Sequence, residues 1–381
     1  MGHVPEIETP PSSPPIFQTT AFDIADLNVL ADLHSGSARG HIYTRDSNPN
    51  HSALADSIAS LEGADAGAVF ASGMGAIAAV TMTLAGAGDH ILVARSMYGI
   101  TLKLMRRLQK TFGVEVCYFD ATDASSLSSL VRGNTKFCLL ETVSNPLLEV
   151  SDIPGIVAAL NDVPLVVDST FTTPELIRPI ELGATIVIHS ASKYLNGHGD
   201  VMLGVAAGDA TTMRAVRATS SVFGQNANPF ESWLTQRGLR TLPLRMKHIA
   251  ATSAQIADFL NSHSGCASVF HPSLPGHQTR SVADRLLPNG SGGIVTFELP
   301  GGGKDAVTSF MQRLPSIPFS ATLADARTTL SHPATTSHGF MTRQDRLNIG
   351  ITDEMIRLSV GLETFEQLRD ELDTALGGTG V

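Results

Sequence analysis

The central part of the chain, from about residue 66 to residue 208, alternates short apolar runs with segments of helical periodicity. Consecutive positions in these runs are apolar, as in strands that helices cover on both faces. This alternation predicts an α/β protein with a mainly parallel central sheet. We expect one of the intervening helices at ASSLSSLVRG (124–133). The predicted strands are AGAVFAS, HILVARS, VEVCYF, KFCLLE, PLVVDS, TIVIHS and MLGVAAG.

The pattern changes on either side of this region, which predicts three parts. Proline and serine crowd residues 5–15, so we expect residues 1–50 to form an extended arm that contacts a neighbouring subunit. Residues 51–240 form the large domain. Beyond it the pattern loosens into a long helix, a glycine-rich strand and further helices, which predicts a smaller α+β domain over residues 241–381.

Composition and charge exclude several classes of protein. Of the 381 residues, 43% are hydrophobic and 16% are charged, which excludes a disordered chain. The net charge of −10 opposes binding to nucleic acid. A low charge content together with a high apolar content favours an oligomer, because part of the apolar surface is then buried between subunits.

Cysteine usage and hydropathy predict a cytoplasmic protein without membrane contact. No run reaches the roughly 18 consecutive apolar residues that a spanning helix needs. The three cysteines have neither metal-site nor disulfide spacing, which fits a reducing compartment. His189, His198 and Asp200 lack a third ligand at suitable spacing, so we predict no metal site.

A glycine loop follows the first predicted strand. Residues 73–78 satisfy the pattern G-x-G-x-x-A between a strand and a helix. As a nicotinamide site the loop needs an acidic residue after the next strand, but Arg95 stands there, which leaves an NADP-dependent oxidoreductase as a distant alternative. A phosphate site at a helix N-terminus and a simple packing turn remain equal alternatives for this loop.

Two further strand ends carry a lysine with hydroxyl groups and a lone carboxylate. Ser190, Ser192 and Lys193 follow one strand, and Asp168 ends another. Two hydroxyls can bind a phosphate while the lysine amine reaches a carbonyl carbon, as a Schiff-base cofactor requires. A buried carboxylate needs a partner, for which a protonated pyridine nitrogen is suitable. Considered alone, Asp168 is more simply explained as a helix N-cap and Lys193 as a solvent-exposed loop lysine. Considered together, the two residues favour a site for a Schiff-base cofactor.

With these residues in place, the sequence resembles the pyridoxal-phosphate (PLP) enzymes of cysteine and methionine metabolism. This family includes cystathionine γ-lyase, methionine γ-lyase, cystathionine γ-synthase and the homoserine-ester sulfhydrylases. The resemblance covers nearly the whole chain and implies the fold type I, aspartate aminotransferase-like architecture. It rests on IYTRDSNPN (42–50), ASGMGAIAA (71–79), SMYGIT (96–101), ETVSNPLLEVSDI (141–153), VVDSTFTTP (166–174), IHSASKYLNGHGDVMLG (188–204), NPFESWLTQRGLRTLPLRM (228–246), LSHPATTSH (330–338) and GITDEMIRLSVGLE (350–363).

The resemblance implies a set of cofactor contacts. Lys193 would be the Schiff-base lysine and proton carrier, Asp168 the partner of the pyridine nitrogen, and Tyr98 the ring stacked on the cofactor. The phosphate would be held by backbone amides and hydroxyls of Gly73, Met74, Ser190 and Ser192.

It also implies contacts to substrate and to a second subunit. Tyr43 and Arg45 on the arm would reach the phosphate of a neighbouring subunit, in a homo-oligomer built as a dimer of dimers. Arg357 would bind the α-carboxylate of an amino-acid substrate, with Asn145 nearby. A structural salt bridge is the alternative for Arg357.

The implied activity is a carbon–sulfur γ-lyase that acts on L-methionine or L-cystathionine and uses Lys193 and Tyr98 as catalytic residues. Three positions near the substrate depart from the family patterns: Ile100, Thr322 and Arg327. An apolar wall at Ile100, with Arg327 in place of a glutamate, favours methionine. The alternatives are γ-replacement by a cystathionine γ-synthase or an O-acylhomoserine sulfhydrylase.

Overall fold

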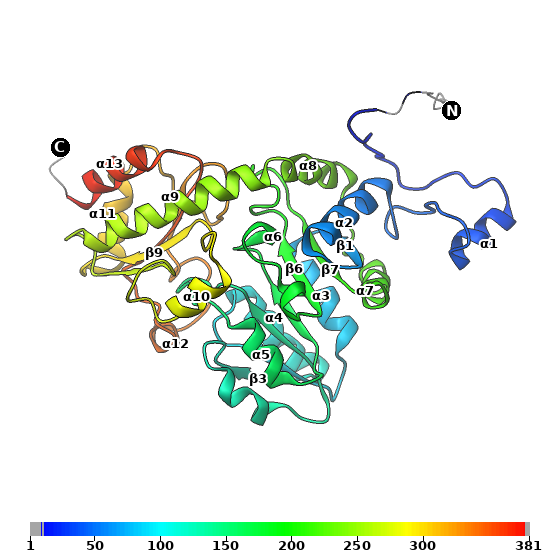
Figure 1. The fold of residues 1–381 in the computed structure, drawn as a ribbon, viewed down its shortest axis with the longest axis horizontal. Helices are drawn as coiled ribbons and strands as arrows, with labels where there is room; N and C mark the ends of the chain where they lie inside the picture. The colour runs from blue at the N-terminus through cyan, green and yellow to red at the C-terminus, as the bar shows by residue number, and fades with distance from the viewer. Residues whose placement is uncertain (1–8, 10, 378–381) are drawn as a thin grey trace.

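Two β-sheets organise the chain (Figure 1), of which the computed structural model describes residue 9 and residues 11–377. The larger sheet has seven strands in the order β1-β7-β6-β5-β4-β2-β3. Strands β3, β2, β4, β5 and β6 run parallel, whereas β7 pairs antiparallel with β6 and β1. The mainly parallel sheet predicted from the sequence is therefore confirmed. The bounds are β1 Ala66–Phe70, β2 His90–Ala94, β3 Glu115–Phe119, β4 Thr135–Glu141, β5 Leu165–Asp168, β6 Ile186–Ser190 and β7 Gly204–Gly208.

Helices pack on this sheet on both of its sides. Helix α2 packs on β1 and β7, while α3 and α7 pack on each other and against β1 and β7. The helices of this part are α2 Pro49–Glu62, α3 Gly73–Leu84, α4 Gly99–Phe112, α5 Ile153–Leu160, α6 Thr173–Leu176, α7 Ala210–Phe223 and α8 Pro229–Leu239, with 3₁₀ helices η1 Ala124–Leu130 and η2 Pro179–Leu182.

Local sequence explains where α2 starts and stops. The Asn48 side chain accepts a hydrogen bond from the Asn50 N–H, and Pro49 occupies the first turn, where its missing N–H costs nothing. The helix ends at Gly63, whose φ of 70° favours glycine.

The segment 124–130 differs from the α-helix that we expected. It forms the 3₁₀ helix η1, in which serine occupies four of the seven positions. Serine hydroxyls compete for backbone groups and thereby weaken the α-helical pattern.

The smaller sheet is antiparallel, with four strands in the order β10-β11-β9-β8. Helix α9 runs along the upper side of Figure 1 from α8 toward α13. Its first half packs in the core of the large sheet and its second half in the core of the small sheet. The bounds are β8 Ser268–Phe270, β9 Ile294–Glu298, β10 Thr329–Ser331, β11 Met355–Ser359, α9 Leu242–Ser262, α10 Arg280–Leu286, α11 Gly303–Gln312, α12 Arg343–Asn348 and α13 Phe365–Leu376.

One large hydrophobic core lies on each sheet, and the division into a large and a small domain stays a prediction. The boundary predicted at residue 240 falls between α8 and α9. Because α9 contributes side chains to both cores, the boundary itself stays a prediction. No helix among residue 9 and residues 11–377 has the length and apolar character needed to cross a membrane.

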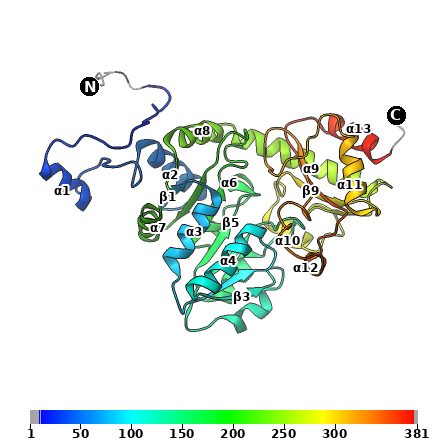
Figure 2. The same cartoon turned by 180° about the vertical axis from the view of Figure 1, so that it is seen from behind.

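The N-terminal arm extends away from both sheets (Figures 1 and 2). Its helix α1 (Leu27–Ser35) buries none of its residues. The arm is tied to the body where Asn50 Oδ1 accepts a hydrogen bond from the Phe17 N–H at 2.8 Å and Asn48 Nδ2 donates to the Phe17 carbonyl at 2.9 Å. The contact of this arm with a second subunit stays a prediction.

Candidate active site

A cavity of about 970 Å³ opens at the carboxyl ends of β4, β5 and β6. Segments of the C-terminal part close its other side, including the loop 320–325 and residues 335–337. The cavity brings together all of the predicted site residues except Tyr43 and Arg45. Those that line it are Gly73, Met74, Tyr98, Ile100, Asn145, Asp168, Ser190, Ser192, Lys193, Thr322 and Arg357.

One end of the cavity is formed by the start of α3 and the residues after β6. A Cβ atom on Gly73 would lie 2.8 Å from the Cβ of Ser190, so only glycine fits there without displacing the neighbouring backbone. The Ser72 hydroxyl caps α3 by accepting a hydrogen bond from the Gly75 N–H at 3.0 Å. Amides of the first helical turn and the Ser190 hydroxyl therefore lie together, as an anion site requires. The Ser192 hydroxyl also lines the cavity, and it donates to the Leu203 carbonyl at 3.2 Å and accepts from the Leu203 N–H at 2.8 Å.

Strand order argues against a nicotinamide site at this loop. In a Rossmann fold the glycine loop follows a strand at the centre of a parallel sheet. Here β1 lies at the edge of the sheet and pairs only with β7, antiparallel. The oxidoreductase alternative therefore lacks its architecture.

Lys193 projects into the cavity close to the loop that carries Thr322. Its Nζ donates a hydrogen bond to Thr322 Oγ1 at 3.0 Å. Burial, together with the positive charge of Arg357, lowers the pKa of Lys193 to about 8. A larger fraction of neutral amine than in an ordinary lysine is therefore present near neutral pH, as a nucleophilic or proton-accepting lysine needs.

Asp168 ends β5 with its carboxylate at the cavity. It accepts hydrogen bonds from the Thr170 N–H at 3.0 Å and from Thr170 Oγ1 at 2.5 Å. Burial raises the pKa of Asp168, and the two bonds from Thr170 oppose that rise. Asp168 is not the N-cap of α6, because Thr172 holds that position. Both hydrogen bonds from Thr170 go to Oδ1, so Oδ2 can meet a cationic partner in the cavity.

Arg357, on β11, reaches the cavity from the small sheet. Its side chain is 4% exposed, and its Nη1 donates to Asn145 Oδ1 at 3.0 Å. Its Nε finds no hydrogen-bond partner among the described residues. Burial lowers the pKa of Arg357 to about 10, so the guanidinium remains charged at neutral pH. A buried cation with an unused donor fits an incoming carboxylate better than it fits a structural salt bridge.

Tyr98 and Glu141 form a contact that the sequence analysis missed. The Tyr98 N–H donates to Glu141 Oε1 at 2.7 Å, and both side chains line the cavity. Burial raises the pKa of Tyr98, so its phenol is protonated at neutral pH. Glu141 ends the run KFCLLE, and the rule that singled out Asp168 at a strand end would have found it as well.

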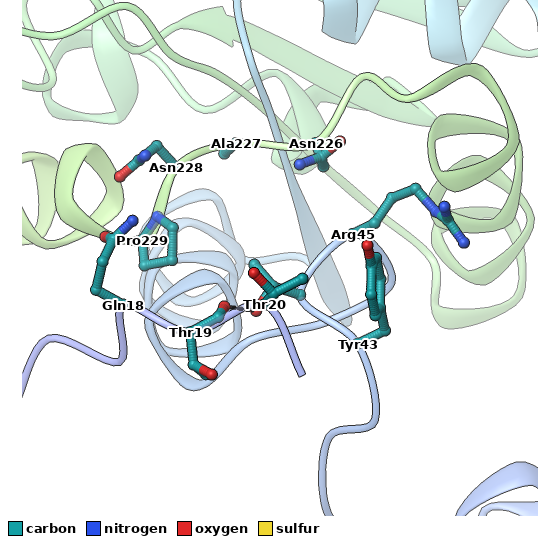
Figure 3. A pocket seen from close by; sticks show the side chains of 10 residues that line it. Gln18, Thr19, Thr20, Tyr43, Arg45, Asn226, Ala227, Asn228 and Pro229 are labelled. Carbon is teal, nitrogen blue, oxygen red and sulfur yellow. Dashed lines mark hydrogen bonds between the residues drawn. The ribbon is translucent and has the colours of Figure 1, made fainter. Parts of the chain in front are cut away.

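Tyr43 and Arg45 lie elsewhere, in a separate pocket of about 500 Å³ (Figure 3). The guanidinium carbon of Arg45 lies 5.0 Å from the centre of the Tyr43 ring. In Figure 3 these two side chains stand on the arm, across from the segment 226–229. They do not line the Lys193 cavity of their own chain, and their contact with a neighbour's phosphate stays a prediction.

The loop 322–327 corrects one expectation about the substrate end. Arg327 is exposed and is not part of the cavity lining, whereas Asp325 is. Ala324 adopts a φ of 65°, and its N–H donates to Ser359 Oγ at 2.7 Å. This local turn presents Asp325 in place of Arg327. Ile100 lies on the cavity wall as expected.

The residues present fit pyridoxal phosphate. An amine, a buried carboxylate, a helix N-terminus with two hydroxyls and a tyrosine ring lie around one cavity, which matches the aldehyde, pyridine nitrogen, phosphate and ring face of that molecule. Among the described residues, no group of three His, Cys, Asp or Glu side chains is arranged to hold a metal ion.

Comparison with known proteins supports the same cofactor. The sequence profile of the Cys/Met metabolism PLP-dependent enzymes matches residues 2–377. An O-succinylhomoserine sulfhydrylase of Pseudomonas aeruginosa is 37% identical over 95% of this chain and 90% of its own length. An L-methionine γ-lyase of Fusobacterium nucleatum is 35% identical over 95% of this chain and 92% of its own.

Solved structures agree with the fold. A cystathionine γ-synthase of Xanthomonas oryzae superposes with a TM-score of 0.89 at 33% identity, over 96% of this chain and 92% of that chain. A Campylobacter jejuni structure that contains pyridoxyl-lysine monophosphate superposes with a TM-score of 0.91 at 28% identity, over 96% and 95% of the two chains. The fold is that of the PLP-dependent fold type I enzymes, and the chain belongs to the Cys/Met metabolism family of PLP-dependent enzymes.

Proposed function

We propose that this enzyme is a carbon–sulfur γ-lyase, which eliminates the γ-substituent of a sulfur amino acid. The favoured substrate is L-methionine, with L-cystathionine second, and with one water molecule consumed the products are 2-oxobutanoate, ammonia and a thiol. The observation that carries the proposal is the convergence on one cavity of the Lys193 amine, the Arg357–Asn145 pair, the Tyr98 phenol and the apolar wall at Ile100.

Pyridoxal phosphate, when bound, supplies the electron sink that makes the Cα and Cβ protons of the substrate acidic. Asp168 would hold its pyridine nitrogen, and the start of α3 with Ser190 and Ser192 would hold its phosphate. The remaining steps fall to side chains of the chain itself.

Arg357 and Asn145 orient the substrate. The unused donors of the guanidinium bind the α-carboxylate, and the hydrogen bond of 3.0 Å to Asn145 Oδ1 fixes the plane of the guanidinium. The γ-substituent then points away from Arg357 toward the wall that contains Ile100.

Lys193 and Tyr98 move protons. The neutral amine of Lys193 takes the Cα proton and later a Cβ proton, and Thr322 Oγ1 steers Nζ through the 3.0 Å hydrogen bond. The protonated phenol of Tyr98 donates to the leaving sulfur, so that the substituent departs as a neutral thiol.

A γ-replacement is the second candidate. It is supported by the likeness to an O-succinylhomoserine sulfhydrylase and to a cystathionine γ-synthase. Its structural support is the row of hydroxyl groups on the cavity wall, which suits a polar acyl leaving group. These are Ser320, Thr335, Thr336 and Ser337.

One assay separates the two candidates. Release of 2-oxobutanoate would be measured from methionine, cystathionine, O-acetylhomoserine and O-succinylhomoserine, each with and without sulfide. We expect oxobutanoate from methionine without added sulfide. Homocysteine formed from an acylhomoserine and sulfide, with no oxobutanoate from methionine or cystathionine, contradicts the lyase and establishes replacement.

The same proposal extends to assembly. We propose a cytoplasmic homo-oligomer, a tetramer built as a dimer of dimers, in which Tyr43 and Arg45 complete the phosphate site of a neighbour. The exposed helix α1 and the open pocket beside Tyr43 support a second copy in this position. Sedimentation equilibrium of the PLP-loaded protein tests it, and a monomer at micromolar concentration contradicts it.

A further inference from the structure

Glu141 is a buried carboxyl group in the cavity to which the proposed reaction gives no task. It ends β4, is 8% exposed, and pairs in register with Asp168 at the end of β5. Two carboxyl groups at facing positions of adjacent strands repel one another when both are ionised. A residue held in so unfavourable a place calls for a function.

The partners of Glu141 indicate that function. The Tyr98 N–H donates to Glu141 Oε1 at 2.7 Å, and the backbone N–H of Asn145 lies on the same carboxyl group and lowers its pKa. Tyr98 is the N-cap of α4 and makes no side-chain cap there. Glu141 therefore joins the start of α4 to the turn that follows β4. These two segments carry the proposed acid and the proposed partner of Arg357.

We propose that Glu141 is a positioning residue, which fixes Tyr98 and Asn145 through their backbone N–H groups and does so as a neutral acid that leaves the negative charge to Asp168. The inference rests on the roles proposed above for Tyr98 and Asn145. The carbonyl oxygen of a neutral acid has two lone pairs, which suffice for two N–H donors.

The surroundings explain which of the two carboxyl groups keeps the proton. Burial raises the pKa of Glu141 well above its usual range and the charge of Asp168 raises it further, and the smaller opposing effect of the Tyr98 and Asn145 N–H groups does not cancel this rise. Burial raises the pKa of Asp168 as well, but the hydrogen bonds from Thr170 and the nearby His189 lower it. The cavity that contains the two carboxyl groups is also lined by Tyr98, Lys193, Asp325 and Arg357. Asp168 is therefore the group that ionises first.

The test compares three variants of the full-length protein. Glu141→Gln keeps the shape and a carbonyl acceptor but can never be charged. Glu141→Met has a similar volume and no acceptor of comparable strength. Thr142→Val is the matched control, because Thr142 is the next buried residue of the chain and bonds Thr172 Oγ1 at 2.9 Å, outside the cavity lining.

Binding of pyridoxal phosphate to the apo-protein and the visible circular dichroism of the bound cofactor report on Tyr98, while KM for the amino acid reports on Asn145. We expect Glu141→Gln to stay within about threefold of the native protein in all of these measurements. We expect Glu141→Met to bind the cofactor and the substrate roughly tenfold more weakly and to change the dichroism, because two buried N–H groups lose their acceptor. Thr142→Val should lower only the melting temperature.

Two outcomes overturn the inference. If Glu141→Met, like Thr142→Val, changes only the melting temperature, Glu141 does not position Tyr98 or Asn145. If Glu141→Gln binds the cofactor or the substrate tenfold more weakly than the native protein, the negative charge of Glu141 is needed. This variant tests the inference even if Glu141→Met does not fold. Tyr98→Ala and Asn145→Ala, measured in the same way, isolate the proposed function: if neither weakens binding, the roles of Tyr98 and Asn145 fail independently of Glu141.

Discussion

The Lys193 cavity and the Tyr43–Arg45 pocket both contain charged side chains, but they differ in what holds those side chains in place. In the cavity, Lys193, Asp168 and Arg357 are largely buried, and each has a hydrogen-bond partner within 3.0 Å. In the pocket, the Arg45 side chain is 51% exposed, and its ion pair with Asp46 spans 3.8 Å. An exposed pair of that length contributes little to stability.

This difference in burial indicates that the Lys193 cavity is already organised within one chain. Burial shifts the pKa values of Lys193, Tyr98 and Arg357 in the cavity. Such shifts need a preorganised, desolvated surrounding, and one chain supplies it. Arg45 has no comparable surrounding in its own chain, and the proposed contact with a neighbouring subunit would supply one. Substitutions in the two regions should therefore differ in size and in their dependence on assembly.

The largest effect is expected for Lys193→Ala. Removing the proton carrier should lower kcat by on the order of 10²–10⁴-fold and abolish the visible absorbance of lysine-bound cofactor, with the melting temperature little changed. Stopped assays of 2-oxobutanoate and absorbance spectra measure the two effects. Turnover near the native level without an added amine contradicts the assignment of Lys193.

The second largest effect is expected for Arg357→Ala. Loss of a desolvated carboxylate pair costs about 2–5 kcal/mol, which raises KM roughly 30- to 4,000-fold. Arg357→Lys keeps the charge but not the two-pronged geometry, and should recover only part of the loss. Steady-state kinetics over a wide substrate range measure both variants. An unchanged KM in Arg357→Ala places the carboxylate site elsewhere.

A smaller effect that depends on assembly is expected for Arg45→Ala. Loss of one charge-assisted hydrogen bond to a phosphate costs about 1.5–3 kcal/mol, so cofactor affinity should fall roughly 10- to 100-fold. Tyr43→Phe should lower the cofactor affinity by a smaller factor, because the variant keeps the aromatic ring. Titration of apo-protein with pyridoxal phosphate gives these affinities.

Mixing subunits shows whether the arm acts on its own chain or on a neighbour. A hybrid of Arg45→Ala and Lys193→Ala subunits should regain activity if the arm acts on a neighbour, since one of its two sites is then complete. No recovery under verified subunit exchange means that the arm serves its own chain, and this would remove the contrast between the two regions.

The sequence predicts the Lys193 cavity better than it predicts the surroundings of Arg45. Parallel strands end at one edge of a sheet, so Asp168, Ser190 and Lys193 could be placed together from hydrophobic pattern alone. Backbone conformation in irregular loops left no such signal. The φ of 65° at Ala324 decides that Asp325 rather than Arg327 meets the cavity, and no spacing rule indicates it. The contact proposed for Arg45 lies on a second chain, which the pattern of one chain does not describe.

The smallest predicted effect concerns the wall at Ile100, where the preference for methionine now rests on this side chain without support from Arg327. The terminal methyl of methionine packed on Ile100 gains about 0.8 kcal/mol, or roughly fourfold in kcat/KM. Ile100→Gly should remove that gain and widen the cavity, so that kcat/KM falls for methionine and rises for cystathionine. Ile100→Val is the matched control, since it keeps most of the apolar surface. A native preference for cystathionine contradicts the proposal, and it would assign Asp325 to the substrate's distal ammonium group instead.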